Sequence, residues 1–351
     1  MKNGKIRHVV VAGGAGFLGS HLCDALLADG AHVVCVDSFG TGRRDNLRHL
    51  AREPRFDLVE ADVIEPLPAR LRPDAVFNLA CAASPPLYQA DPEHTMLTNV
   101  LGTRNLLRLA EASGARFLQA STSEVYGDPE SHPQAESYWG NVNPTGPRAC
   151  YDEGKRAAEA LCFDFARGRR AEVRVARIFN TYGPRMRADD GRVVSNVVTQ
   201  ALAGDDITVY GEGHQTRSFC YASDLIEGLL RLMAHERTLG GPPPGPVNLG
   251  NPVELTVADL VERVVALTGS RSKVVNRPLP EDDPKRRRPD ISRAAALLGW
   301  APRTTLDAGL RATVAWFAEE ARRAADRAAP APSPNKAQRR PEPRPVGMGL
   351  G

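Results

Sequence analysis

The segment IRHVVVAGGAGFLG, residues 6–19, sets the pattern for the first half of the chain. Residues 6–12 are an apolar, β-branched run, which predicts a buried strand. The sequence GGAGFLG follows at once, and leucines recur with helical spacing from residue 18 to residue 27. We expect Gly13 to permit a tight turn, Gly16 to let the backbone approach a bound group, and Gly19 to let helix and strand pack closely. The segment therefore predicts a strand, a turn and a helix in direct succession.

The same alternation continues as far as about residue 183. Apolar runs predict further strands at 32–36, 56–60, 75–79, 117–120 and 173–178, and helical spacing lies between them. This alternation is typical of a parallel sheet whose two faces are covered by helices. We therefore predict an α/β fold built on a Rossmann-like, doubly wound parallel sheet, formed by residues 1–183.

The second half of the chain follows a different pattern. Short strands are predicted at 207–210, 218–221 and 247–249, and they mix with helices. We expect residues 184–328 to form a smaller C-terminal α/β substrate-binding lobe, although the helix near 223–236 can return to the first domain. Residues 329–351 hold six Pro, three Gly and no aromatic residue, which predicts a disordered Pro/Arg-rich tail.

Charge and composition exclude several classes of protein. The chain has 351 residues and a net charge of +3, and the tail contributes four basic residues against one acidic residue, so the rest is neutral. A neutral body lacks the basic surface of a nucleic-acid-binding protein. No apolar run is long enough to span a membrane, and the start lacks a signal-peptide pattern. The six cysteines lack metal-binding or disulfide spacing, so we expect no metal, no Cys nucleophile and a cytoplasmic location.

Two features of the first domain predict a dinucleotide cofactor. The helix after the glycine turn offers N–H groups and the positive end of its dipole to a pyrophosphate. Asp37 ends the second strand, 18 residues past Gly19. A carboxylate there accepts hydrogen bonds from ribose hydroxyls and repels a 2′-phosphate, which favours NAD over NADP. The alternatives are NADP, which Arg43 and Arg44 would suit, and a tight turn without a ligand.

We expect NAD to contact the glycine turn, the segment after the second strand, and the ends of later strands. Asp62 and Val63, after the third strand, are suited to the adenine edge. The expected cofactor contacts are Gly13, Gly16, Phe17, Leu18, Gly19, Asp37, Ser38, Phe39, Thr41, Gly42, Asp62, Val63, Leu79, Ala80, Thr98, Ala120, Tyr151 and Lys155.

A tyrosine and a lysine predict the catalytic group. Tyr151 and Lys155 are four residues apart on a predicted helix, so they share a face. Beside bound NAD⁺, the lysine ammonium favours phenolate over phenol, and such a tyrosine can take a proton from a substrate hydroxyl. A surface lysine after a half-buried tyrosine is the alternative. The order along the chain favours a site, because residues 121–124 (STSE) follow a strand and place the Thr122 hydroxyl at its end.

Longer blocks of sequence carry a family resemblance. GGAGFLG, STSEVYG and YxxxK together resemble the extended short-chain dehydrogenase/reductase superfamily acting on nucleotide sugars. Residues 120–156, 177–196, 208–221 and 282–291 narrow the resemblance to the UDP-glucuronate decarboxylases, also called UDP-xylose synthases. The resemblance covers roughly residues 6–320.

The resemblance implies a mechanism. Tyr151, tuned by Lys155 and assisted by Thr122, would deprotonate the C4 hydroxyl of UDP-glucuronate while NAD⁺ accepts hydride. The resulting β-keto acid would lose CO2, and Glu124 would position a water, or act itself, to protonate C5 before hydride returns to C4. Related 4,6-dehydratases carry an aspartic acid where this chain has Ser123. Loss of water from C6 therefore lacks its proton donor, whereas loss of CO2 needs none.

The resemblance also implies substrate contacts and a dimer. Arg287 matches an arginine near the sugar carboxylate, with a solvated charge as the alternative. The other expected substrate-binding residues are Ser84, Pro85, Asn180, Arg185, Tyr210, Gln215 and Arg217; for Tyr210 and Arg217 the alternatives are a core residue and a strand-edge charge. Relatives form homodimers through a four-helix bundle, which residues 99–112 and 155–167 would supply here.

Three positions depart from the family pattern. A lysine that contacts substrate usually stands where this chain has Leu97, a histidine where it has Asn78, and an asparagine where it has Ser38. Two other functions stay open. One is a nucleotide-sugar 4-epimerase or another enzyme that forms a keto sugar on the same scaffold. The other is a non-catalytic, NAD-binding regulatory protein.

Overall fold

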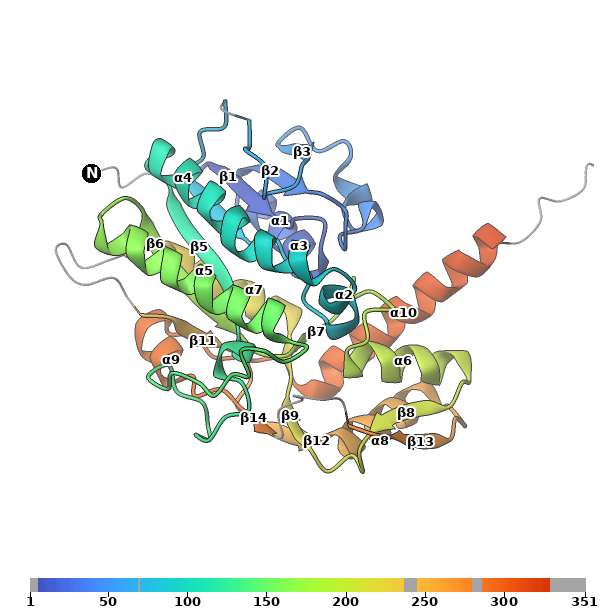
Figure 1. Ribbon diagram of the computed structural model, residues 1–351. Coiled ribbons are helices and arrows are strands. Elements are labelled where there is room, and N and C mark those ends of the chain that lie inside the picture. The colour runs from blue at the N-terminus through green and yellow to red at the C-terminus, as the bar shows by residue number, and fades with distance from the viewer. Residues whose placement is uncertain (1–5, 69, 237–244, 280–285, 329–351) are drawn as a thin grey trace, which may run out of the picture.

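The computed structural model describes residues 6–68, 70–236, 245–279 and 286–328. Its larger part is a seven-stranded parallel sheet in the order β11-β6-β5-β4-β1-β2-β3 (Figure 1). The strands are β1 (His8–Ala12), β2 (His32–Asp37), β3 (Phe56–Glu60), β4 (Ala75–Asn78), β5 (Arg116–Thr122), β6 (Glu172–Ile178) and β11 (Val247–Leu249). The predicted Rossmann-like, doubly wound sheet is confirmed.

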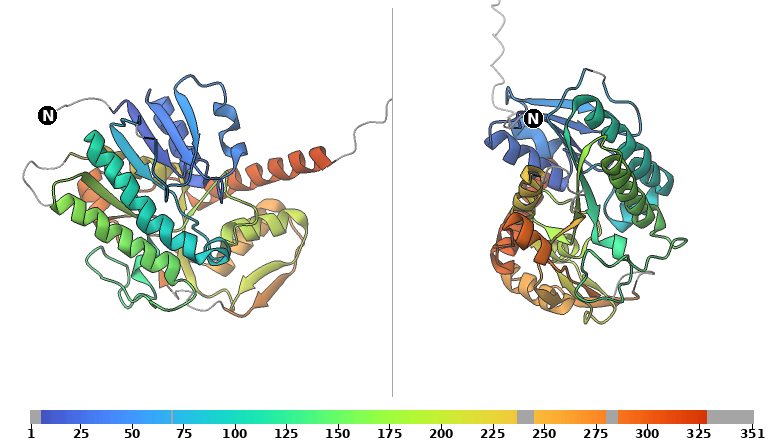
Figure 2. Two further views of the ribbon diagram at one scale, coloured as in Figure 1. Left: turned by 45° about the horizontal axis from the view of Figure 1, so that its top comes forward. Right: turned by 90° about the vertical axis from the view of Figure 1, so that its left-hand side faces the viewer.

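Helices cover both faces of this sheet. α1 (Phe17–Ala28) and α7 (Ala222–Ala234) pack together on one face, whereas α4 (Thr103–Ser113) and α5 (Ala149–Arg167) lie side by side on the other (Figures 1 and 2). The sheet is therefore buried on both sides, and the apolar run Val9–Val11 in β1 is inaccessible to solvent. Shorter elements connect the rest: η1 (Arg44–Leu50), α2 (Pro85–Ala90), α3 (Pro92–Leu97), η2 (Thr98–Gly102), η3 (Ser123–Tyr126) and α9 (Ser292–Leu298).

A smaller α/β part lies beside the sheet and has its own apolar core. α6 (Val193–Ala203), α8 (Val257–Thr268) and α10 (Leu306–Ala328) contribute side chains to that core. Short strands complete this part: β8 (Ile207–Tyr210) pairs with β13 (Val274–Arg277), and β9 (Thr216–Ser218) pairs with β12 (Glu254–Thr256) and β14 (Arg286–Arg287). In Figure 1, α10 extends away from this part toward the right of the view.

Two segments beyond residue 183 return to the larger part. α7 packs against α1, a return that we left open for the helix near 223–236, and β11 pairs with β6. The boundary expected at residue 183 is therefore too simple for β11, which follows much of the smaller part in sequence. The division into two domains otherwise stays a prediction, and the tail predicted at 329–351 lies outside the described residues.

Two predicted strands have different limits. The strand expected at 218–221 is interrupted at Phe219, where the chain leaves β9 and enters β10 (Cys220–Tyr221), which pairs with β7 (Thr181–Tyr182). β5 continues to Thr122, two residues beyond its expected end, because it pairs with β6 as far as Ile178. No helix in the described part of the chain combines the length and the apolar character needed to cross a membrane.

Candidate active site

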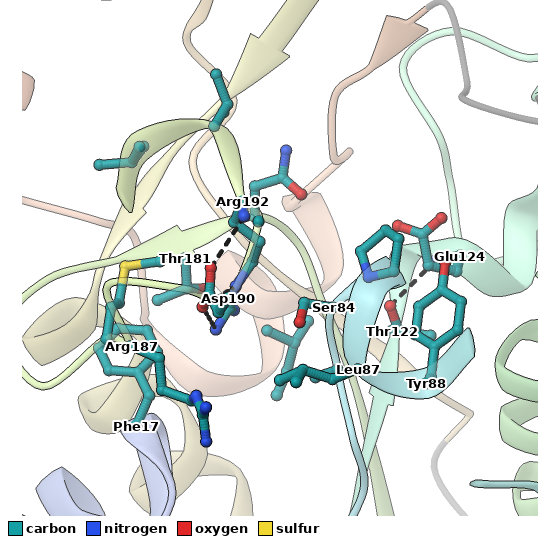
Figure 3. Close-up of a pocket in the computed structure, with 18 of the residues that line it drawn as sticks. Phe17, Ser84, Leu87, Tyr88, Thr122, Glu124, Thr181, Arg187, Asp190 and Arg192 are labelled. Atoms are coloured by element: carbon teal, nitrogen blue, oxygen red, sulfur yellow. Dashed lines mark hydrogen bonds and ion pairs between the residues drawn. The ribbon is translucent and has the colours of Figure 1, made fainter. Parts of the chain in front are cut away.

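A cavity of about 540 Å³ lies between the sheet and the smaller part, at the carboxyl ends of β1, β4, β5 and β6. This edge of a doubly wound sheet is where ligands bind in such folds. Side chains from both parts line the cavity, and Figure 3 shows α2 facing the segment that precedes α6 across it. Sequence segments that are far apart in the chain therefore meet at one place.

The glycine turn forms one wall of this cavity. Gly13 has a φ of +76°, and a Cβ there would lie 2.7 Å from the carbonyl carbon of Leu79. A Cβ at Gly19 would lie 2.0 Å from the Gly13 carbonyl oxygen. Gly16 caps the N-terminus of α1 and lines the cavity, so the first free N–H groups of the helix are available there. A side chain at Gly13 or Gly19 would collide with backbone atoms, so this tight turn needs glycine at both positions. The N–H groups that the turn leaves free at the cavity suit a pyrophosphate.

Asp37 supports the glycine turn from the end of β2. Its Oδ2 atom accepts a hydrogen bond from the Ala15 N–H at 2.8 Å, and its Oδ1 atom accepts one from the Phe39 N–H at 2.8 Å. Burial raises the pKa of the Asp37 carboxyl, and the two N–H donors act in the opposite direction. A Cβ at Gly42 would lie 2.6 Å from Asp37 Oδ1. Asp37 thus joins the turn to the segment that follows β2.

The predicted cofactor contacts fall into two groups. Some line the cavity: Gly13, Gly16, Phe17, Leu18, Gly19, Thr41, Leu79, Ala120, Tyr151 and Lys155. The others are not among the residues that line it: Asp37, Ser38, Phe39 and Gly42 at or after the end of β2, Asp62 and Val63 after β3, Ala80 after β4, and Thr98 in η2. In this second group, Asp62 Oδ2 lies 2.7 Å from His94 Nε2, and the buried Thr98 hydroxyl has no partner among the described residues.

The catalytic residues predicted from sequence meet at the end of β5. Thr122 ends that strand, Glu124 lies in the 3₁₀ turn η3, and α5 presents Tyr151 and Lys155. All four are buried and line the cavity. Lys155 Nζ donates a hydrogen bond to the Ala120 carbonyl oxygen at 3.0 Å and lies 5.7 Å from the centre of the Tyr151 ring. The helical spacing therefore puts both side chains on the face of α5 that is turned to the sheet.

Burial controls the ionisation of this pair. It raises the pKa of Tyr151 well above its usual value, although a hydrogen bond with the Thr122 side chain opposes the shift. Burial also lowers the pKa of Lys155. The protein by itself therefore keeps Tyr151 as a phenol. The phenolate that we expected from Lys155 depends on charge brought to the site by bound ligands.

Glu124 and Arg287 form a buried ion pair. Arg287 Nη1 lies 2.8 Å from Glu124 Oε1, and its Nη2 atom lies 3.0 Å from Oε2. Arg148 Nη2 lies 2.6 Å from the same Oε2, and Arg287 also donates to Asn180 Oδ1 at 3.1 Å. All three charged side chains are buried. The alternative of a solvated Arg287 is therefore wrong, and its charge is shared with Glu124.

The substrate-binding residues predicted from the resemblance all line the same cavity: Ser84, Pro85, Asn180, Arg185, Tyr210, Gln215, Arg217 and Arg287. Tyr210 is exposed and its carbonyl accepts a hydrogen bond from Gln215 Nε2 at 2.7 Å, so Tyr210 is not a core residue. Arg217 is buried on β9, which rules out an exposed strand-edge charge. Arg185 has a φ of +69° and pairs with Asp24 of α1 at 2.7 Å.

Several cavity residues were not predicted individually. Arg187 and Arg192 lie across the cavity from Ser84 and Tyr88 (Figure 3). Buried Asp190 holds Arg192 through two contacts of 2.6 and 2.8 Å. These residues lie in the block 177–196, which carries the family resemblance. Their charge within that block is the feature of the sequence that could have indicated a role in the site. Arg148 lies three residues before Tyr151, and only the fold shows that it reaches Glu124.

The departures from the family pattern have local explanations in two cases. Asn78 ends β4 and is buried; its Nδ2 donates to Gln119 Oε1 at 2.9 Å and to Thr103 Oγ1 at 3.1 Å. An amide at this position therefore satisfies a polar network under α4. Leu97, the last residue of α3, is half-buried and is not among the described residues that line the cavity. Nothing in the structure explains Ser38.

The sequence matches the model of the NAD dependent epimerase/dehydratase family over residues 9–250. The chain belongs to this family. Among curated members, UDP-glucuronic acid decarboxylase 4 of Arabidopsis thaliana is 55% identical over 306 residues, which are 87% of this chain and 67% of that protein. UDP-glucuronic acid decarboxylase 1 of Danio rerio is 52% identical over 90% of this chain and 73% of its own length. UDP-glucuronic acid decarboxylase 6 of Arabidopsis thaliana is 52% identical over 86% of each chain. The chain thus spans about two thirds or more of the length of these relatives.

Solved structures of similar proteins share the fold of this chain. UDP-glucuronic acid 4-epimerase from Bacillus cereus, in complex with UDP-glucuronic acid and NAD, is 28% identical, with a TM-score of 0.79 over 89% of this chain and 99% of that one. The dTDP-glucose 4,6-dehydratase DesIV from Streptomyces venezuelae, with NAD bound, is 29% identical, with a TM-score of 0.80 over 89% and 97%. The chain is therefore an NAD-dependent enzyme whose relatives act on nucleotide sugars.

Proposed function

We infer that this protein is an NAD-dependent UDP-glucuronic acid decarboxylase, a carboxy-lyase that converts UDP-glucuronate into UDP-xylose and CO2. The observation that carries the conclusion is its identity of 51–55% to relatives with that name over 86–90% of the chain. Solved epimerases share the scaffold at 26–28% identity. The site chemistry agrees, because a buried Tyr, Lys, Thr and Glu meet at one cavity.

NAD is the cofactor that the glycine turn fits, and when bound it would accept hydride from C4 and return it after CO2 has left. We propose that the cofactor contacts predicted from the sequence hold it, with the N-terminus of α1 at the pyrophosphate and Asp37 at the adenosine ribose. The steric demands at Gly13 and Gly19 support this arrangement. The buried, unpartnered hydroxyl of Thr98 also supports a ligand near η2.

In the first step, Tyr151 acts as a base. Its hydroxyl, hydrogen-bonded with the Thr122 side chain, would take the proton of the C4 hydroxyl as C4 is oxidised to a ketone. Lys155 supports this role because its ammonium lies beside the ring and is held by the Ala120 carbonyl. A positively charged ligand in the site would add to the ammonium in favouring phenolate.

The second step is loss of the carboxylate. A ketone at C4 makes the C6 carboxylate part of a β-keto acid, so the electron pair of the breaking C5–C6 bond passes into the C4 carbonyl. Tyr151, now protonated, would donate a hydrogen bond to the enolate oxygen. Ser123 supports this course over loss of water, because a serine cannot protonate a leaving hydroxyl as a carboxylic acid would.

The third step is protonation of C5. The family resemblance leaves two roles for Glu124, which either positions a water or delivers the proton itself. Its contacts with Arg148 and Arg287 support the first alternative, since a carboxylate shared by two guanidinium groups acts as an acceptor. We therefore propose that Glu124 orients a water, and that solvent supplies the proton that the overall reaction consumes.

The nucleotide and the assembly are further proposals. We propose that Asn180, Arg185, Tyr210, Gln215 and Arg217 bind the UDP part of the substrate, because they converge on the part of the cavity contributed by the smaller lobe. We also propose a homodimer through α4 and α5, which lie side by side (Figure 1). The six cysteines are free, which supports a cytoplasmic location.

One assay tests the function. Purified protein loaded with NAD is incubated with UDP-glucuronate, and both CO2 and the nucleotide sugar are followed by mass spectrometry. We expect CO2 and UDP-xylose, and the absence of CO2 from folded, NAD-loaded protein would contradict the conclusion. The solved 4-epimerase structures favour a second candidate, which would convert UDP-glucuronate without any change of mass. A regulatory protein would leave UDP-glucuronate unchanged.

A further inference from the structure

The Tyr88 side chain has a polar group that the protein does not use. Its ring is buried and lines the cavity, and its hydroxyl has no hydrogen-bond partner among the described residues. Buried hydroxyls in proteins are nearly always paired, and an exception indicates a missing partner such as a ligand or a water. Tyr88 was not among the residues predicted from the sequence.

The position of this ring is fixed by its surroundings. It stacks on Tyr151 with 5.0 Å between ring centres and 6° between planes. Its backbone N–H donates to the Ser84 carbonyl at 3.0 Å, and Cys150 Sγ lies 3.7 Å from its carbonyl oxygen. The hydroxyl is therefore held at one place beside the proposed catalytic base, and free rotation of the side chain cannot bring it to another partner.

The Tyr88 hydroxyl lies near the buried ion cluster formed by Glu124, Arg148 and Arg287. Figure 3 shows the hydroxyl on the side of the ring turned toward Glu124. Both arginines and Glu124 act electrostatically on it, and burial raises its pKa, so the hydroxyl stays protonated and can donate. The phenol thus offers its proton to an acceptor at the edge of this cluster.

The charge of the cluster indicates which acceptor it suits. Two guanidinium groups share the single carboxylate of Glu124. Asp152, the next carboxyl group, has its pKa raised to about 8 by burial and by Glu124, so it adds little negative charge at neutral pH. With Asp152 protonated, the two arginines and Glu124 carry a net positive charge in a buried site, which favours an anionic ligand group.

We propose that Tyr88 is a specificity-determining residue whose hydroxyl donates a hydrogen bond to the C6 carboxylate of UDP-glucuronate. This inference rests on the proposed function, which supplies the acid sugar. The carboxylate is the anionic group that UDP-glucuronate has and UDP-xylose lacks. A neutral phenol can orient this group without neutralising it, whereas a direct arginine contact would stabilise the substrate against loss of CO2.

Binding to two ligands tests the proposal. The measurements use NAD-loaded protein carrying Tyr151→Phe, which keeps the stacked ring and slows turnover by about 10²–10⁴-fold. Adding Tyr88→Phe removes one oxygen atom. We expect the Kd for UDP-glucuronate, measured by calorimetry, to rise about tenfold, equivalent to about 1.4 kcal/mol. The Kd for UDP-xylose should stay within about twofold, since a hydrogen bond to an absent group cannot be lost.

Tyr138→Phe is the matched control, because Tyr138 lies outside the residues that line the cavity; both affinities should be unchanged. Unaltered binding of UDP-glucuronate by Tyr88→Phe would overturn the proposal. An equal loss for both ligands would also overturn it, because the contact would then be to a sugar hydroxyl or to the nucleotide. Failure to fold would contradict it too, by showing a structural partner for the hydroxyl. Release of CO2 by the unchanged protein tests the decarboxylase function separately.

Discussion

Arg287 and Glu124 are 163 residues apart in sequence, and two of their atom pairs lie 2.8 and 3.0 Å apart at the edge of the cavity. Arg287 belongs to β14 in the smaller part, whereas Glu124 follows β5 in the main sheet. Their contact therefore fixes the relative position of the two walls that a substrate would touch. Arg148 adds a third buried charge from the residue before α5.

We predict strong coupling between these two residues. Glu124→Gln leaves the buried Arg287 without its carboxylate partner, which costs about 3–5 kcal/mol in the free energy of unfolding. Arg287→Gln should cost less, because Arg148 still contacts Glu124. The double variant should lose less than the sum of the two, with a coupling energy of about 0.5–3 kcal/mol. Denaturant unfolding monitored by circular dichroism measures all three. Additive losses would show that the pair does not stabilise the fold.

The exposed pair of Arg263 and Asp307 provides the matched control. Their side chains lie 2.6 Å apart and both are about half exposed, at 49%. Solvent weakens such a pair, so Asp307→Asn should change the free energy of unfolding by no more than about 1 kcal/mol.

Tyr151→Phe should separate binding from chemistry. The variant keeps the ring that stacks on Tyr88 and loses the hydroxyl that acts on C4. We expect a folded, NAD-containing protein whose rate of CO2 release falls by about 10²–10⁴-fold, the usual contribution of a general base. Rates with UDP-glucuronate and the absorbance of released cofactor check both parts. A wild-type rate would mean that another group is the base.

Asp152 should make stability depend on pH. Its folded pKa is about 8, above the ordinary value near 3.9, so the folded protein prefers the protonated form. The resulting stability is complete below about pH 4 and is lost as the pH rises through 8. Asparagine resembles the protonated acid, so the melting temperature of Asp152→Asn should exceed that of the unchanged protein by a margin that grows from pH 5 to pH 9.

A second aspartate on the same helix serves as the control for the pH measurements. Asp164 of α5 has a side chain that is 65% exposed. Asp164→Asn should give a melting curve parallel to that of the unchanged protein at every pH. If Asp152→Asn is parallel as well, Asp152 does not retain a proton in the folded state.

Gly19→Ala should impair cofactor binding. The new Cβ would meet the Gly13 carbonyl oxygen at 2.0 Å, so the turn that faces the cavity must move. We expect the NAD content of the purified protein to fall by at least tenfold. Gly114→Ala is the control, because its Cβ would meet nothing within 4 Å although φ is +64°. That strain should cost about 1–2 kcal/mol of stability and leave the NAD content unchanged.

Local patterns in the sequence were enough to predict the sheet, the glycine turn and the shared helix face of Tyr151 and Lys155. The glycine turn lies between a strand and a helix that are adjacent in sequence, and Tyr151 and Lys155 share a face because of helical geometry alone. The partners of Glu124 could not be predicted in this way. Arg287 reaches it only because β14 pairs with β9 in another sheet, and strand pairing of that kind leaves no periodic signal in the sequence.

The same limit applies to the edge of the main sheet and to Tyr88. The residues 247–249 read as a strand, but nothing in their sequence indicates that they pair with β6. Tyr88 lies on a six-residue helix among apolar neighbours and resembles an ordinary core aromatic. Its unpaired hydroxyl becomes visible only when the positions of all its neighbours are known.

The late return of β11 to the sheet has a consequence for synthesis on the ribosome. Until residue 249 has emerged, one side of β6 presents unpaired backbone groups along Ala176–Ile178, an open edge that can recruit strands from other chains. The main sheet therefore cannot fold completely before the chain has been synthesised as far as β11. A chain that is cut or stalled after residue 183 should aggregate, and the full-length chain depends on rapid closure of that edge.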